Sequence, residues 1–161
     1  MEQAVPLIYT RSAEARLLPA RGRLAAMGIA IGCLVPLVVA ARLQPSAAGF
    51  ATHTQLGLQE CAFLQRTGLP CPSCGMTTSW AWFVRGNLVA SLYVQPMGTV
   101  LAVITVAGVW VGFYVAIIGR PVYRLLRLLP GRYYFVPLLS FAILAWGWKI
   151  YIHLAGVDGW R

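Results

Sequence analysis

Three long apolar runs constrain the fold of this chain more than any other feature. They cover residues 24–41, 97–118 and 134–155, and a helix needs about 20 residues to cross the hydrocarbon core of a bilayer. The 161 residues are 59% hydrophobic and only 11% charged, whereas an ordinary soluble domain has about 25% charged residues. The sequence therefore predicts an all-α integral membrane protein with three transmembrane helices.

The net charge of +9 is concentrated beside the ends of these runs. Eight of the thirteen Lys and Arg residues form two clusters, which are Arg11, Arg16, Arg21 and Arg23, and then Arg120, Arg124, Arg127 and Arg132. Basic clusters beside apolar spans set membrane orientation, so both clusters are expected on the cytoplasmic side. No module that combines basic and aromatic residues for base stacking is visible, and we expect no nucleic-acid partner.

This orientation divides the chain into seven segments. They are a basic cytoplasmic arm (1–23), transmembrane helix 1 (24–41), an external loop (42–96), transmembrane helix 2 (97–118), a basic cytoplasmic loop (119–133), transmembrane helix 3 (134–155) and an external tail (156–161). We expect a multi-pass protein of the bacterial inner (plasma) membrane with a cytoplasmic N-terminus. Its first apolar run exceeds the 7 to 15 residues usual in a cleaved signal peptide, so we expect this run to be retained.

Small residues occur at helical spacing in the first two runs. The first contains Gly28-x3-Gly32 and the second contains Gly108-x3-Gly112. Such strips allow the backbones of two membrane helices to approach closely. The sequence predicts that the first two spans pack together through these four glycines.

The second half of the external loop has a helical pattern. Apolar residues recur every four positions at Trp80, Val84, Leu88 and Leu92, and Gly86 interrupts the series. A fourth span here is disfavoured because Arg85 would lie in mid-bilayer. We expect an amphipathic helix, or a bent pair of short helices, against the outer membrane surface.

Three cysteines gather in the external loop with the spacing Cys61-x9-Cys71-x2-Cys74. In one interpretation Cys71 and Cys74 form a disulfide that clamps the loop, as is usual in an oxidising compartment. In a second, they are a redox dithiol in which Cys71 attacks and Cys61 or Cys74 resolves. In a third, the three cysteines and His53 bind zinc, since Cys-x2-Cys is a common half-site. The sequence leaves these alternatives open.

Two other ionisable residues lie four apart near the outer end of the third run. Lys149 and His153 therefore share one helix face. Long basic side chains near helix ends usually extend toward the membrane surface, and we expect this behaviour of Lys149.

The cysteine segment resembles a known family. The resemblance rests on Cys61-Ala-Phe-Leu, on Thr67-Gly-Leu-Pro-Cys-Pro-Ser-Cys-Gly-Met-Thr, on Arg85-Gly-Asn and on Gln95-Pro. These motifs are similar to those of the DUF2752 family of small bacterial membrane proteins, over about residues 58–118. Many members have arginine where this chain has Thr78. The resemblance implies a membrane location and names no substrate.

The sequence favours a non-enzymatic docking or accessory protein with a cysteine-clamped external element. It shows no paired acids for general acid–base catalysis and no glycine-rich phosphate loop or His-Glu-x-x-His metal helix. Its partners would be the lipid bilayer and either another protein or a second copy of the chain. The alternatives are a membrane-bound thiol–disulfide oxidoreductase and a zinc-binding membrane protein. Zinc is the one cofactor considered, and otherwise we expect none.

Overall fold

A computed structural model describes residues 17–120, 122 and 132–160 of the chain, and these residues form six α-helices without a strand. The three long helices are α1 (Ala20–Arg42), α5 (Pro96–Ile118) and α7 (Arg132–Leu154). The short elements between α1 and α5 are the 3₁₀ helix η1 (Thr52–Leu56), α2 (Ala62–Thr67), α3 (Met76–Phe83) and α4 (Leu88–Val94).

All three long helices are long and apolar enough to cross a membrane. This confirms the predicted all-α membrane class. Helix α1 begins at Ala20, before its apolar run, and its Arg23 donates hydrogen bonds to the carbonyls of Ala116 and Ile117 at the end of α5. Most of the predicted basic arm and of the loop 119–133 lies outside the described residues.

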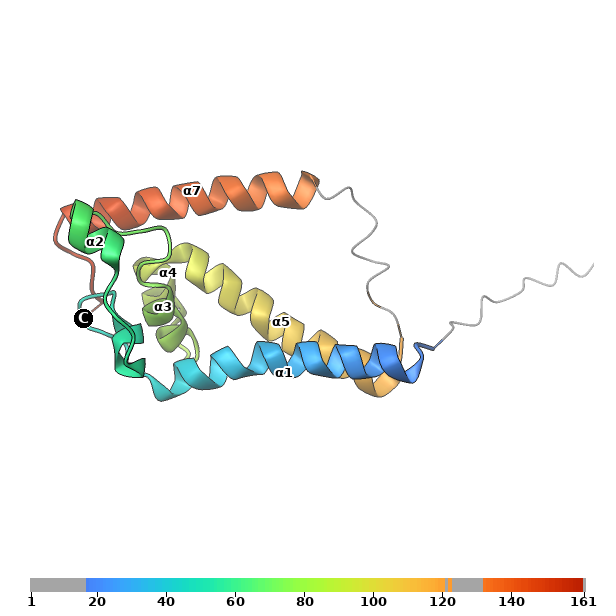
Figure 1. Ribbon diagram of the computed structural model, residues 1–161. Helices are drawn as coiled ribbons and strands as arrows, with labels where there is room; N and C mark the ends of the chain where they lie inside the picture. Colours follow the sequence, from blue (N-terminus) through green and yellow to red (C-terminus); the bar gives the residue numbers. More distant parts are fainter. Residues whose placement is uncertain (1–16, 121, 123–131, 161) are drawn as a thin grey trace, which may run out of the picture.

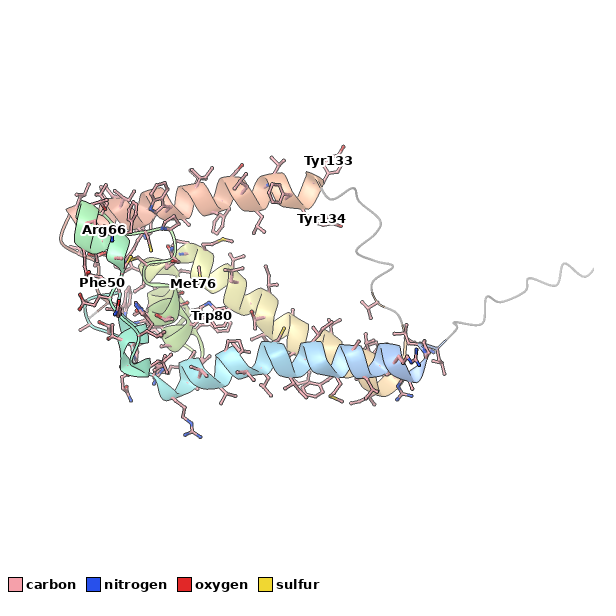
Figure 2. The ribbon with its side chains drawn as sticks, viewed as in Figure 1. Phe50, Arg66, Met76, Trp80, Tyr133 and Tyr134 are labelled. Carbon is pink, nitrogen blue, oxygen red and sulfur yellow. The ribbon has the colours of Figure 1, made fainter. Side chains whose placement is uncertain are left out.

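The short elements gather at one end of the molecule. Figure 1 shows the C-terminal ends of α1 and α7 there, together with α2, α3 and α4. Figure 2 places Phe50, Met76 and Trp80 at this end and Tyr133 and Tyr134 at the opposite one. We call it the thiol end, because Cys61, Cys71 and Cys74 lie in its connecting segments.

Helices α1 and α5 pack closely, but not through all four predicted glycines. A Cβ atom on Gly112 would lie 2.8 Å from the Cβ of Ala30, and one on Gly108 would lie 3.0 Å from the Sγ of Cys33. By contrast, Gly28 and Gly32 have no such neighbour within 4 Å. The prediction for α1 is therefore corrected. Its contact strip consists of Ala26, Ala30 and Cys33. Ala26 and Ala30 lie two residues from the glycines, which is more than half a helical turn.

The predicted bent pair of helices is present as the α3–α4 hairpin. Gly86 has a positive φ of 80° in the turn, and the Asn87 side chain accepts a hydrogen bond from the Ala90 N–H at the start of α4. Arg85 donates to the carbonyl of Ala81 and to those of Ala40 and Ala41 at the end of α1. The hairpin is thereby fixed to the last turn of α1.

The buried face of this hairpin is small and hydroxylated. Ser79, Ser91 and Thr99 share hydrogen bonds of 2.7 to 3.2 Å between their side-chain oxygens, whereas Leu88 and Leu92 are about half exposed. The large apolar residues that define the sequence pattern thus face outward at α4. Lipid accepts apolar side chains as readily as a protein interior does. The hydroxyl groups therefore take the inner positions, where they form hydrogen bonds with one another.

Candidate thiol site

The fold brings three cysteines from two segments together. Cys61 directly precedes α2, while Cys71 and Cys74 lie in the turn before α3. Their three sulfur atoms lie within 4.8 Å of one another, and the Sγ atoms of Cys71 and Cys74 are 3.5 Å apart. All four cysteines of the chain, including the distant Cys33, are unbridged. We refer to Cys61, Cys71 and Cys74 as the cysteine cluster.

Residues far away in the sequence hold the turn that carries two of these cysteines. The Gln95 side chain donates to the carbonyl of Pro72 over 2.8 Å, and the Trp146 indole donates to the carbonyl of Pro70 over 2.9 Å. The sequence analysis did not predict that either residue would hold the cysteine turn. Gln95 directly precedes Pro96 in the family-like Gln-Pro motif, which is the one sequence signal that could have pointed to it.

Gly75 determines how the turn passes into α3. Its φ is +84°, and a Cβ atom there would lie 2.8 Å from the carbonyl oxygen of Gly49. A side chain would therefore be strained by the backbone conformation and blocked by the loop that follows α1. Glycine is therefore required directly after Cys74, where the backbone lies against this loop.

The three thiols have different electrostatic surroundings. The pKa of Cys61 is lowered from 9.0 to about 7, chiefly because its sulfur accepts a hydrogen bond from the Leu64 backbone N–H in the first turn of α2. Burial raises the pKa of Cys74 to about 12, and only 7% of this residue is exposed. Near neutral pH the cluster therefore combines a readily ionised thiol with a buried protonated one.

His53 lies outside the cysteine cluster. Its Nε2 atom lies 3.1 Å from the carbonyl oxygen of Gln59, and the group of metal-ligating atoms that converge here contains cysteines alone within the described part of the chain. The cysteine cluster offers three sulfur ligands to a metal ion. The predicted fourth ligand, His53, does not join this group of ligand atoms.

A cavity of about 670 Å³ opens beside the cysteine cluster. Its walls come from the last turns of α1, from η1 and from α2 and α3, and they are mainly apolar; all three cysteines and His53 line it. Val35 of α1 also lines the cavity and is 54% exposed. The cavity therefore connects the sulfur atoms with the outer surface of a membrane-spanning helix.

A second polar group fastens the end of α7. Lys149 is fully buried; its Nζ lies 2.9 Å from Oδ1 of Asp158 and donates to the carbonyl of Gly49 over 3.3 Å. The other carboxylate oxygen of Asp158 pairs with His153. Our expectation that Lys149 extends to the membrane surface was wrong, because the C-terminal tail folds back and its Asp158 supplies an internal partner.

Comparison with known proteins identifies one family. Residues 61–109 match the family model DUF2752, which is described as a protein of unknown function. No curated protein and no solved structure matches the chain. The matched range includes the cysteine cluster, the α3–α4 hairpin and the first part of α5. Over residues 61–109 the chain is thus similar to the DUF2752 family, whose function is unknown.

Proposed function

We propose that the chain is a membrane-anchored thiol–disulfide oxidoreductase in which Cys71 and Cys74 alternate between dithiol and disulfide. The observation that carries this proposal is the position of the cysteine cluster, whose unbridged sulfur atoms line a large cavity. A disulfide that only clamps a loop needs no cavity, and structural zinc sites are closed by four ligands. The location of the cysteine cluster beside a cavity therefore favours a redox reaction at these cysteines over a purely structural role in a docking protein.

The exchange reaction follows from the different burial of the two cysteines. With Cys71 and Cys74 joined as a disulfide, a thiolate of a client dithiol attacks the Sγ of Cys71, because Cys71 is the less buried of the two residues. The S–S bond breaks, its electron pair stays on Cys74, and the Cys74 thiolate takes up the proton that the client thiol released. The second client thiolate then attacks the client sulfur of the mixed disulfide. The client leaves as a disulfide, and Cys71 and Cys74 are reduced.

The charge pattern of the sequence supports an external location for this chemistry. Arg21, Arg23 and Arg120 of the basic clusters lie at the end of the molecule opposite the cysteines, and such clusters remain in the cytoplasm. Clients would then be secreted or periplasmic proteins that contain paired cysteines. Disulfides persist in that compartment.

Equilibration in glutathione buffers of increasing oxidised fraction tests the proposal. After acid quenching and alkylation, peptide mass mapping should show that Cys71 and Cys74 lose their free thiols together, while Cys33 stays reduced. A Cys74→Ser variant should form a mixed disulfide through Cys71 with a two-cysteine peptide that is added as its disulfide, and a Cys33→Ser variant serves as the control. If no bridge forms at any glutathione ratio, the proposal is wrong.

A soft metal site is the second candidate, and the sulfur spacing favours it. Zinc–sulfur bonds of about 2.3 Å in a tetrahedral site place the sulfurs about 3.8 Å apart, which is within the range of the cysteine cluster. Metal analysis of protein purified without chelator separates the candidates. One tightly held zinc ion per chain, lost in Cys61→Ser, supports the metal site. A Cys71–Cys74 couple that persists in Cys61→Ser supports the redox role.

A further inference from the structure

We propose that the cavity beside the cysteine cluster binds a quinone-class electron acceptor from the bilayer, which reoxidises Cys71 and Cys74. This inference rests on the proposed redox function and names its second substrate. When the Cys71–Cys74 disulfide has oxidised a client, the two cysteines are left as a dithiol. This dithiol must pass two electrons and two protons to an acceptor before it can oxidise another client.

The walls of the cavity are suited to an acceptor that dissolves in lipid. Its volume of about 670 Å³ lies within the range of about 300 to 1,000 Å³ usual for small-molecule sites. Its lining is mainly apolar and includes Pro36, Val39 and Leu43 of α1. Because Val35 both lines the cavity and is exposed on this membrane-spanning helix, a ligand can enter from the hydrocarbon side.

The aromatic and thiol groups of the cavity suit a quinone ring. Trp80 lines the cavity, and flat aromatic rings stack favourably on one another. The cysteine sulfurs line the same cavity, so one ligand can contact both the indole and the thiols.

The reaction balances without a further component. The thiols of Cys71 and Cys74 each lose one electron and one proton, and a bond forms between their sulfurs. The quinone gains these two electrons and two protons, and both of its carbonyl oxygens become hydroxyl groups. The hydroquinone then returns to the bilayer, where other membrane oxidases reoxidise hydroquinones.

The test uses the reduced full-length protein and decylubiquinone, whose ring is fully substituted and offers no vacant carbon for thiol addition. Quinone absorbance and free thiols are followed together. We expect one quinone reduced for every two thiols lost, a protein mass lower by two protons, and no reduction in Cys71→Ser or Cys74→Ser. Cys33→Ser should behave as the unmodified protein.

Two pairs of variants test the binding place. Val39→Trp fills the cavity and should raise the quinone KM at least about tenfold, whereas Val38→Trp changes the neighbouring position outside the cavity and should not. Trp80→Phe replaces the indole that lines the cavity by a smaller ring and should also raise KM, whereas Trp110→Phe makes the same change at an exposed tryptophan of α5 and should not.

Oxidation by diamide, a small water-soluble oxidant, separates failure of this inference from failure of the proposed function. If diamide forms the Cys71–Cys74 bridge but decylubiquinone does not, the quinone site is wrong and the redox function stands. Equal quinone KM values for Val39→Trp and Val38→Trp would also show that the quinone does not bind in this cavity. If neither oxidant forms the bridge, the proposed function fails as well.

Discussion

Cys61 illustrates how a single backbone contact changes the chemistry of a side chain. Its sulfur accepts a hydrogen bond from the Leu64 N–H, and its pKa is lowered to about 7. The pKa of Cys74, in the same cluster, is raised to about 12 by burial. The two thiols therefore ionise in different pH ranges although their sulfur atoms lie within 4.8 Å.

Alkylation of the reduced, metal-free protein should follow this order. Because a lowered pKa means that the thiolate forms as pH rises through about 7, Cys61 should react with iodoacetamide at half its maximal rate near that pH. Cys74 should react last throughout the range from pH 5.5 to 9. Peptide mass mapping measures each site separately. Similar pH profiles for Cys61 and Cys74 would contradict the assigned surroundings.

The buried Lys149 makes a second prediction at the residue scale. Replacement by Met leaves Asp158 without its cationic partner, and breaking a buried ion pair costs about 3 to 5 kcal/mol. Lys149→Met should therefore lower the midpoint of thermal unfolding in detergent, followed by tryptophan fluorescence. The double variant Lys149→Met/Asp158→Asn removes both charges and should recover much of the loss. A single variant as stable as the double one would speak against the pair.

Among the elements, α1 and α5 make the tightest contact. A Cβ atom on Gly108 would lie 3.8 Å from the Cβ of Cys33, which is the mean Cβ–Cβ separation of disulfides, about 3.8 Å. Gly108→Cys should therefore form a bridge with Cys33 under mild oxidation, seen as one linked peptide by mass spectrometry. Gly32→Cys, which has no close neighbour, provides the matched control. Equal cross-linking of both variants would reject the packing described here.

Local patterns predicted the elements better than their contacts. Continuous apolar runs identified all three long helices, because length and hydropathy are local properties. The glycines of α5 lie at its contact with α1, but the partner strip contains Ala26, Ala30 and Cys33, which carry no comparable signal. The pair of Lys149 with Asp158 depends on a tail that folds back, and a sequence pattern does not reveal such a fold.

The cysteine site was predictable only in part. The spacing of Cys71 and Cys74 indicated a close pair, and Cys61 was a candidate through its presence in the same loop. Its convergence with that pair depends on contacts made by Gln95 and Trp146, which lie 21 or more residues beyond Cys74 in the chain. The cavity forms only where the last turns of α1 lie beside these segments. No local pattern encodes these long-range contacts.

The whole molecule has two chemically different ends, and this difference predicts its orientation. In intact cells, a membrane-impermeant maleimide should label Cys71 in a variant whose other cysteines are serine. With all four native cysteines replaced, Arg120→Cys at the opposite, exposed end should be labelled only after permeabilisation. Labelling in the reverse pattern would place the thiol end in the cytoplasm.

Helix α7 is fastened chiefly at the thiol end, where Trp146, Trp148 and Lys149 donate hydrogen bonds to Pro70, Tyr93 and Gly49. From Tyr133 to Ser140 every residue is exposed, and Figure 1 shows this half of the helix well apart from α1. Membrane helices adjust to bilayers of different thickness by tilting. Fastened in this way, α7 can change its tilt in thicker or thinner bilayers while the geometry of the three sulfurs stays constant.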